Sequence, residues 1–476
     1  MNRRAFLFGS AAAAAAGAAA RKGFANGEPA APLAPFQRDF LFGAATSSVQ
    51  TEGAAREDGK GESIWDRFST RPGAIADGSN PSVACDSYHQ WPRDLALIRQ
   101  IGLQSYRFSI AWPRILPTGA GEINQLGVDH YNKIIDALLE AGVQPLATAY
   151  HWDLPQALED KGGWPNRDTA GRFADYVHIL AQEFGDRVTR WCLLNEPQAF
   201  TVWAYGHGVH APGLRDRGKM LRAIHTSNLA QGAGFRAVKS VRPKARVGIA
   251  HDMELFDAAS SSEADRRACE RFFTFRNLWF LDPVFTGKYP DAFDHGGVPY
   301  EEMGWKPGDE ERMRAALDFS GMNFYGGRTL IAAGDSWELL KELNAHGATR
   351  NMHEPDTMER ACLWMAERYK RPVEITETGF GGNDVLTAEG KVHDRERIAW
   401  LTGAFSGIRR AQLKGAEIAS VHVWSLIDDW EWQDGFRDHL GLAWVDFANP
   451  VQRIPKDSAG WYSELIGTRR LDRFHS

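Results

Sequence analysis

A long alternation of two kinds of segment runs through this chain from Phe40 almost to its end, and it constrains the fold more than any other feature. Short runs rich in β-branched and aromatic residues, which are typical of strands, alternate with stretches whose apolar residues recur at helical spacing. About eight such units in one series favour a (β/α)8 barrel over a doubly wound sheet. The sequence therefore predicts an α/β fold, a single (β/α)8 TIM barrel with extended βα loops. The expected strands are Phe40–Thr46, Ser105–Ile110, Gln144–Tyr150, Arg190–Leu194, Arg246–Ala250, Asp318–Phe324, Pro372–Thr376 and Ser420–Trp424.

Amphipathic periodicity predicts the helices between these strands, most clearly over Val128–Glu140. Six apolar residues of that stretch fall on one face, and Gly142 follows as a stop signal. These six are Val128, Tyr131, Ile134, Ile135, Leu138 and Leu139. The other expected helices are Arg93–Ile101, Thr169–Phe184, Met220–Val241, Asp356–Tyr369 and Arg395–Gln412.

Composition excludes several classes of protein. The 476 residues would fill about three average domains, but a barrel with long loops can hold such a length as one domain. With 55 Lys and Arg against 61 Asp and Glu, the net charge of −6 offers no field that would attract nucleic acid or anionic lipid. A hydrophobic content of 43% argues against disorder. The four cysteines have no CxxC spacing, so neither a disulfide framework nor a structural zinc site is expected, and Cys192 is interpreted as core filling.

The N-terminus reads as a targeting segment. Arg3 and Arg4, followed by an apolar pair and an Ala-rich run, match a bacterial twin-arginine export signal. The apolar run is shorter than the ~20 residues that a membrane span requires. We therefore expect a signal peptide cleaved near Ala20, a mature chain that is not inserted in the membrane, and a periplasmic location. Residues 1–35 are interpreted as signal segment and linker, and residues 36–476 as the barrel domain.

Polar and aromatic residues stand at the carboxyl end of nearly every predicted strand. Because these strand ends form one rim of a (β/α)8 barrel, we expect the side chains to converge on a single pocket. Any one of them is an ordinary residue where a strand meets a loop, but chance explains the whole set poorly. The set comprises Gln50, Arg107, His151, Trp152, Asn195, Glu196, Asn323, Tyr325, Glu377 and Trp424.

Two carboxylates of this rim, Glu196 and Glu377, suggest its chemistry. Two carboxyl groups can divide acid and nucleophile roles when their surroundings push their pKa values apart. A glycosidase needs such a pair, and a separation of about 5–5.5 Å predicts retention while ~6.5–9.5 Å predicts inversion. Metal-assisted hydrolysis would instead need clustered ligands, and the close pair His207 and His210 has no carboxylate nearby in the sequence. No metal and no other cofactor is implied.

A second signal lies in residues 423–432, which contain three Trp and three acidic residues. Trp faces stack on the apolar face of a pyranose, and carboxylates accept hydrogen bonds from its hydroxyls. A Trp-rich plug of the barrel is the simpler interpretation for Trp430. It is less suitable for Trp424 and Glu431, which lie beside the end of the last strand.

Taken in order, the motifs of this chain resemble glycoside hydrolase family 1, the family of many β-glucosidases, from about Phe36 to Ile466. The motifs that carry the resemblance are Phe40–Gly53, Tyr88–His89, Tyr106–Pro117, Tyr150–Pro155, Asn195–Pro197, Thr376–Gly379 and the Trp-rich segment 423–432. Each match alone is weak, but all of them at family-like spacing are specific. The resemblance implies a barrel that forms a glycosidase catalytic domain over residues 36–476.

The resemblance also implies a role for each site residue. Glu196 matches the general acid/base and Glu377 the nucleophile of a retaining mechanism. Arg107 and Tyr325 match the residues that flank the nucleophile and keep it ionised, and Asn195 matches the residue that holds the sugar 2-hydroxyl. Trp424 matches the platform under the sugar ring. The residues that match binding of the glycone hydroxyls are Gln50, His151, Trp152, Glu431 and Trp432.

The expected activity is hydrolysis of terminal non-reducing β-D-glucosyl residues from small β-glycosides or oligosaccharides. A β-galactosidase or β-fucosidase, or a transglycosylase, would use the same site, and an inactive glycan-binding barrel is the alternative from another class. The chain departs from the family pattern at Thr378, where the family has Asn, at Phe324, and at Thr349–His353, where a Gly-Trp pair is missing. These departures concern leaving-group preference. Glu431 would repel a phosphate, so phosphorylated sugars are not expected as substrates. The oligomeric state is not indicated.

Overall fold

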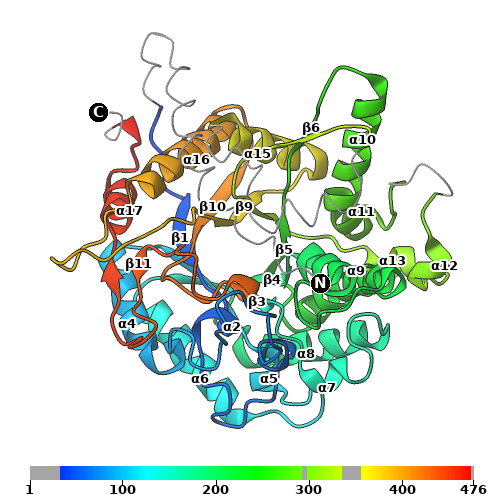
Figure 1. Ribbon diagram of the computed structural model, residues 1–476, viewed down its shortest axis with the longest axis horizontal. Coiled ribbons are helices and arrows are strands. Elements are labelled where there is room, and N and C mark those ends of the chain that lie inside the picture. The colour runs from blue at the N-terminus through cyan, green and yellow to red at the C-terminus, as the bar shows by residue number, and fades with distance from the viewer. Residues whose placement is uncertain (1–32, 292–296, 335–354, 473–476) are drawn as a thin grey trace, which may run out of the picture.

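The computed structural model describes residues 33–291, 297–334 and 355–472, and within them eight parallel strands close into a barrel (Figure 1). Each strand lies on one of the predicted runs, so the expected (β/α)8 fold is confirmed. Around the barrel the strands follow one another in chain order, and β1 closes the ring against β10. The barrel strands are β1 (Leu41–Ala45), β2 (Ser105–Ser109), β3 (Gln144–Tyr150), β4 (Arg190–Asn195), β5 (Arg246–Asp252), β7 (Ser320–Asn323), β9 (Val373–Thr378) and β10 (Ile418–Trp424).

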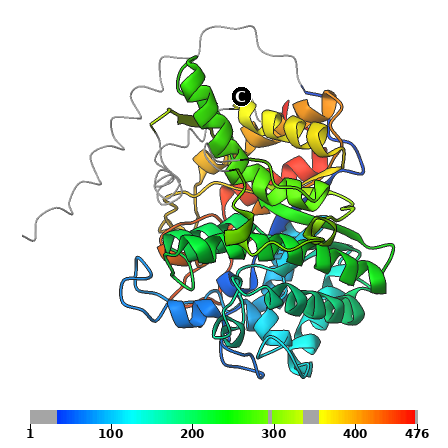
Figure 2. The same ribbon diagram turned by 90° about the vertical axis from the view of Figure 1, so that its right-hand side faces the viewer.

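Helices surround the barrel, and all six predicted ones are present (Figure 1). The long helices α8 and α9 lie side by side against the barrel (Figure 2). These six helices are α4 (Ser87–Ile101), α6 (Gln125–Glu140), α8 (Asp168–Phe184), α9 (Arg217–Val241), α15 (Pro355–Tyr369) and α16 (Arg395–Leu413).

Helix α6 shows how the sequence sets such an element. Its apolar stripe packs on the barrel, with Val128 and Ile135 fully buried, but Leu139 is 39% exposed and so lies off the predicted face. The helix stops as predicted, because Gly142 takes a φ of 73° and lets the next amide return to the carbonyl of Leu138.

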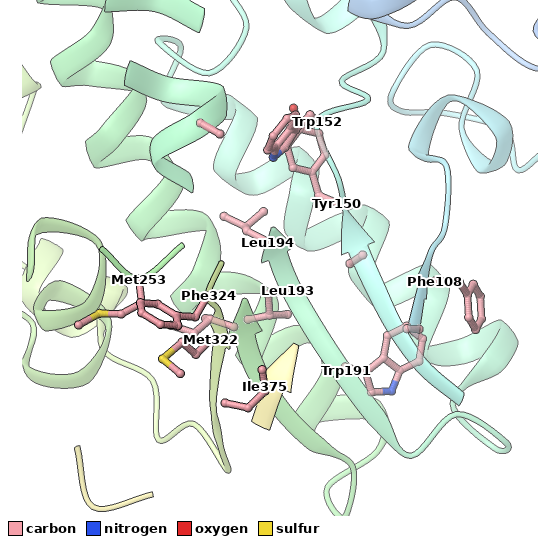
Figure 3. Packing of buried hydrophobic residues seen from close by; sticks show 14 of the residues in the cluster. Phe108, Tyr150, Trp152, Trp191, Leu193, Leu194, Met253, Met322, Phe324 and Ile375 are labelled. Atoms are coloured by element: carbon pink, nitrogen blue, oxygen red, sulfur yellow. The ribbon is translucent and has the colours of Figure 1, made fainter. Parts of the chain in front are cut away.

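The large hydrophobic core lies between the barrel wall and the helices (Figure 3). Leu193 of β4, Met322 of β7 and Ile375 of β9 belong to it, and the last two are register partners on neighbouring strands. Inside the barrel the layer near the amino ends of the strands is polar, where Arg190 forms an ion pair with Glu374. Outward apolar and inward polar residues thus share the same strands, as the two-residue period of a strand allows.

Most of the remaining elements lie in the connections between strands and helices, but α17 (Asp457–Thr468) follows the last barrel strand and contacts α16 and α4. Strands β6 and β8 pair in parallel, and β11 and β12 pair antiparallel. The helices among them are α2 (Ser48–Thr51), α3 (Ile64–Phe68), α5 (Trp112–Ile115), α7 (Gln156–Glu159), η2 (Ala199–His207), α10 (Glu263–Phe273), η3 (Thr274–Leu278), α11 (Trp279–Thr286), α12 (Tyr300–Met303), α13 (Asp309–Met313), η4 (Trp432–Asp434) and α17 (Asp457–Thr468). The short strands are β6 (Phe256–Ala258), β8 (Thr329–Ile331), β11 (Ala443–Trp444) and β12 (Ile454–Pro455).

The predicted targeting segment lies at the start of the sequence, and the mature chain is expected not to enter the membrane. The twin-arginine segment, with its cleavage site near Ala20, lies outside the described residues. Within the described ranges, no helix combines the length and the apolar character that crossing a bilayer would require.

Candidate active site

The predicted rim residues come together at the carboxyl end of the barrel. Asn195 ends β4, Asn323 ends β7 and Trp424 ends β10, while Glu377 stands one residue before the end of β9. Arg107 projects from the middle of β2 and joins two of these strands, because its guanidinium donates to both Glu377 and Asn195. The expectation that these side chains converge is therefore confirmed.

Glu377 is held by one donor on each carboxylate oxygen. Arg107 Nη1 donates to Oε1 at 2.5 Å, and the Tyr325 hydroxyl donates to Oε2 at 2.7 Å. The glutamate is only 3% exposed. Burial, followed by the charge of Glu377, raises the pKa of Tyr325 well above its usual range, so this hydroxyl stays a neutral donor. These two donors, one of them a buried cation, hold both carboxylate oxygens and fix their direction.

The surroundings of Glu196 have the opposite effect. Burial raises the pKa of its carboxyl group well above the usual range, and the charges of Asp252 and Glu377 raise it further. The hydrogen bond that Asn323 Nδ2 donates to Oε1 at 2.7 Å opposes this shift without cancelling it. Glu196 is thus favoured in its protonated form, and the charge of Glu377 contributes to this. Its backbone has a φ of 44°, a region that non-glycine residues rarely occupy outside functional sites.

Asn195 and His151 form a hydrogen-bonded pair beside the two glutamates. Asn195 Oδ1 accepts from Arg107 at 2.7 Å and from Asn323 at 3.0 Å, so its amide group is oriented toward His151 Nε2 at 3.0 Å. Burial, then the charge of Arg107, lowers the pKa of His151 well below its usual range. The imidazole is therefore neutral. Because Nε2 accepts, Nδ1 carries the proton and has no acceptor among the described residues.

Gln50 supplies a second buried donor without a protein acceptor. It is fully buried in α2, and its Oε1 accepts from the Ser47 hydroxyl at 2.7 Å while Nε2 has no partner among the described residues. Buried amide and imidazole donors are normally satisfied. Donors of this kind at the end of the barrel suit a ligand rich in hydroxyl groups.

Aromatic rings line the same site. The rings of Trp152 and Trp432 lie 4.3 Å apart, and His151 stacks on Trp424 with centroids 5.5 Å apart. Trp424 Nε1 donates to Glu431 Oε1 at 3.1 Å, and Trp152 Nε1 donates to the carbonyl of Asn195 at 2.9 Å. The indoles of Trp152 and Trp424 are thus each held by their own N–H.

Trp430 and Cys192, which were interpreted as core residues, and the family departure at Thr378 lie within the described residues. Trp430 is fully buried and its Nε1 donates to Ser79 at 2.9 Å, as expected of a core residue. Cys192 packs inside the barrel with Leu146, and burial raises the pKa of its thiol to about 12, so it is an inert core residue, as expected. Thr378 donates to the carbonyl of Phe324 at 2.8 Å. The predicted difference at Thr349–His353 lies outside the described residues.

Two acidic residues of the site were missed by the sequence analysis. Asp252 raises the pKa of Glu196, and it was overlooked because the fifth strand was predicted to end at Ala250, two residues before its true end. A longer strand would have placed Asp252 on the rim. Asp429 lies between Trp424 and Glu431 in the sequence, and only its position in the Trp-rich segment pointed to it. Within the described ranges, no group of three or more His, Cys, Asp or Glu side chains is arranged to hold a metal ion.

Comparison with known proteins agrees with this geometry. The model of glycosyl hydrolase family 1 matches residues 33–471. Beta-glucosidase A of Thermotoga maritima is 38% identical over 452 residues, which cover 92% of this chain and 99% of that protein. The 1,4-beta-D-glucan glucohydrolase of Thermotoga neapolitana is 38% identical over 446 residues with the same coverage.

A solved structure shows the same agreement in three dimensions. The family 1 β-glucosidase from Thermotoga maritima in complex with isofagomine lactam is similar to this chain with a TM-score of 0.85 at 37% identity, over 91% of this chain and 99% of that one. The matches cover nearly all of the barrel and both glutamates. This chain belongs to glycosyl hydrolase family 1 and is a glycoside hydrolase.

Proposed function

We propose that this glycoside hydrolase is a retaining β-glucosidase, with Glu377 as the nucleophile and Glu196 as the general acid/base. The observation that carries the assignment is the opposite treatment of the two glutamates. Glu377 has a cation and a hydroxyl donor on its oxygens, whereas burial, then Asp252 and Glu377, raises the pKa of Glu196. When the environments of two carboxyl groups favour the protonated form of one over that of the other, they assign the roles of acid and nucleophile.

The chemistry follows in two displacements. In the first, Glu196 gives its proton to the glycosidic oxygen while a carboxylate oxygen of Glu377 bonds to the anomeric carbon, so the aglycone leaves as an alcohol. In the second, Glu196, now ionised, takes a proton from water, which attacks the same carbon and releases Glu377. Two inversions give overall retention. Arg107 and Tyr325 support the nucleophile because they hold its two oxygens.

The remaining side chains would bind the glucosyl unit. Gln50 Nε2 and His151 Nδ1 are buried donors for its hydroxyl groups, and Asn195 is positioned for the 2-hydroxyl. The carboxylate of Glu431 would accept hydrogen bonds from the 4-hydroxyl and 6-hydroxyl of the sugar. The indoles of Trp152, Trp424 and Trp432 form the aromatic surface, with Trp424 as the platform. The names of the Thermotoga relatives, a β-glucosidase and a 1,4-β-D-glucan glucohydrolase, support glucose as the preferred sugar and small β-glycosides or oligosaccharides as substrates.

Proton NMR of 4-nitrophenyl β-D-glucoside mixed with the enzyme tests the proposal. Early formation of β-glucose, followed by α-glucose through mutarotation, is the expected result. Early α-glucose would indicate inversion and overturn the role of Glu377. The Glu377→Gln variant is the matched control, since it keeps the size of the side chain and removes the nucleophile.

A second activity on galactosides or fucosides has a specific basis in Glu431. Its carboxylate, held by Trp424, could accept from a 4-hydroxyl and a 6-hydroxyl together, which reduces discrimination at both positions. Comparing kcat/KM for 4-nitrophenyl β-D-glucoside, β-D-galactoside and β-D-fucoside tests this. The ratio of transfer to hydrolysis products with added acceptor sugar tests transglycosylation.

Export is a separate proposal that rests on Arg3, Arg4 and the Ala-rich run after them. Expressing the full chain in a bacterium and separating the periplasm should recover activity there, with a mature N-terminus near residue 20. A chain with both arginines replaced by lysine should stay in the cytoplasm. Equal distribution of the two chains would exclude twin-arginine export.

A further inference from the structure

Asp429 is a buried acid whose two carboxylate oxygens lack a hydrogen-bond donor among the residues that the structure describes. It lies in the loop after β10, is 1% exposed, and neither oxygen has a hydrogen-bond partner among the described residues when the group is ionised. The neighbouring Asp428, by contrast, accepts hydrogen bonds from Lys456 Nζ at 2.5 Å and from the Gly441 amide at 2.9 Å. A buried carboxylate without donors costs several kcal/mol. Asp429 must therefore be neutral or share a proton.

The groups that face Asp429 identify the partner. Glu431, two residues on, is in hydrogen-bonding contact with it, and burial followed by Glu431 raises the pKa of Asp429 well above its usual range. Asp428 raises it further, although Lys456 neutralises that acid. Ser425 opposes the shift weakly, because its hydroxyl is already donated to the carbonyl of Ile427 at 2.7 Å.

The thiol of Cys85, from the segment before α4, is another group close enough to feel the charge of Asp429. It donates to the carbonyl of Asp428 at 3.1 Å, and burial raises its pKa well above the usual range, so it stays neutral. Arg453 lies beyond this thiol and forms an ion pair with Asp94 at 2.6 Å. No cation is in salt-bridge contact with Asp429 among the described residues.

Glu431 is the group through which Asp429 reaches the site. Burial raises the pKa of Glu431 to about 7, the hydrogen bonds with Asp429 and Trp424 lower it, and the charges of Asp438 and Glu377 raise it. Ionised carboxylates have only acceptors, so two of them can be hydrogen-bonded only when one carries a proton. Paired carboxyl groups that share one proton titrate as a unit.

We propose that Asp429 and Glu431 share one proton and one negative charge, and that Asp429 is a positioning residue that donates this proton to hold the glycone-binding carboxylate of Glu431 in place. The proposal rests on the proposed role of Glu431 in binding the glucosyl unit. With one proton, the pair offers a fixed acceptor to the sugar hydroxyls. When that proton is lost, two negative charges face each other near Glu377, and the orientation of Glu431 is no longer fixed.

The sign of the pH effect follows from the direction of both shifts. The pKa values of Asp429 and Glu431 are raised, so the proton persists above the range in which ordinary carboxyl groups lose it. KM should therefore be low while the pair carries one proton, and it should rise on the alkaline side, where that proton is lost. If only the singly charged pair binds sugar, the rise is about tenfold per pH unit beyond the loss of the proton.

The test compares KM between pH 5 and 9 for the wild type and Asp429→Asn, with 4-nitrophenyl β-D-glucoside as substrate. The asparagine amide donates to Glu431 but cannot titrate. The expected result is a KM close to the lowest wild-type value that no longer rises on the alkaline side. Asp429→Ala, which removes the donor, should raise KM about tenfold at every pH. Asp438→Asn is the matched control, since this exposed acid faces Glu431 through charge alone, and its KM profile should keep the alkaline rise.

An infrared measurement makes the test independent of glucosidase activity. At neutral pH the wild type should show a carbonyl stretch of a protonated carboxylic acid that Asp429→Asn lacks. The Glu196→Gln variant identifies the separate band of Glu196. If Asp429→Asn does not fold, the wild type is compared with Glu196→Gln and with Asp153→Asn, because burial raises the pKa of Asp153 to about 7 and gives it a band of its own. A protonated acid beyond these two is then the expected second band. An alkaline rise of KM that survives in folded Asp429→Asn, or no protonated acid beyond Glu196 and Asp153, would overturn the proposal. Loss of glucoside hydrolysis with the band present would instead count against the proposed function alone.

Discussion

The hydroxyl of Tyr325 donates to Oε2 of Glu377 over 2.7 Å, and the tyrosine comes from the loop after β7 while the glutamate comes from β9. Arg107 holds the other oxygen from β2. Three separate strands or loops therefore fix one carboxylate in space. Such fixing matters because a nucleophile must approach the anomeric carbon along one line, and a small misplacement costs rate.

Replacing Tyr325 with Phe tests this relationship. The variant loses one hydrogen bond to a charged group, for which about 1.5–3 kcal/mol is typical, so kcat/KM should fall about 10- to 100-fold with the fold intact. Tyr462→Phe is the control, because its buried hydroxyl donates to the carbonyl of Gly43 at 2.9 Å, away from the glutamates. That change should lower stability and leave kcat/KM unchanged. Equal kinetic losses in both variants would contradict a specific role for Tyr325.

Glu377→Ala should abolish turnover of 4-nitrophenyl β-D-glucoside, because no carboxylate remains to form the glycosyl-enzyme. Azide is small enough to occupy the space left by the side chain and should restore cleavage. Attack then comes from the face that Glu377 occupied, so the product is the α-glucosyl azide. NMR of the product shows its anomeric configuration. A β-azide would mean that a residue other than Glu377 is the nucleophile.

Glu196→Ala should give the complementary result. Without the acid, substrates with poor leaving groups should lose about 10²–10⁴-fold in kcat/KM, whereas 2,4-dinitrophenyl β-D-glucoside, which needs no proton, should still form the glycosyl-enzyme. Azide should then attack that intermediate and give the β-glucosyl azide. A similar loss for both leaving groups would show that Glu196 is not the acid.

The barrel could be predicted from the sequence because strand and helix periods are local properties. Each strand carries its own β-branched or aromatic run, and α6 carries both its stripe and its stop at Gly142. The end of β5 was not predicted, since His251 and Asp252 are polar and resemble a loop. In the structure they continue the strand, because β5 remains paired with β7 up to Asp252.

The residues that gather at the site could be predicted from the sequence, but the protonation of its carboxyl groups could not. Glu196, Glu377 and Arg107 stand at strand positions that any (β/α)8 barrel brings together. Which carboxyl group keeps a proton depends on contacts from distant segments. Asp428 has Lys456 as a partner, whereas Asp429, among the described residues, faces other acids, a hydroxyl and the thiol of Cys85, although the two are adjacent in the sequence. No local pattern distinguishes them.

The pH dependence of the reaction should respond to Asp252. Glu196 must be protonated for the first step, so the alkaline limb of kcat/KM follows the loss of that proton. Asp252 raises the pKa of Glu196, and Asp252→Asn removes this charge while Arg276 stays paired with Glu254. The pKa of Glu196 should fall, and the alkaline limb should move to lower pH. Asp257→Asn, in a surface pair with Arg360 at 2.9 Å, should leave the limb in place. A limb that moves upward would contradict the electrostatic role of Asp252.

The polar layer inside the barrel should contribute to the stability of the fold. Arg190 and Glu374 form an ion pair there, supported by the hydroxyl of Ser105, which accepts from Arg190 at 3.1 Å. Removing one partner of a buried pair leaves the other charge without compensation and typically costs about 3–5 kcal/mol. Glu374→Gln should therefore lower the urea midpoint of unfolding clearly, while folded enzyme keeps its dependence on Glu196 and Glu377. Glu263→Gln breaks an ion pair of two exposed side chains with Arg267 and should leave the midpoint nearly unchanged. Equal midpoints for the two variants would mean that the buried pair adds no stability to the barrel.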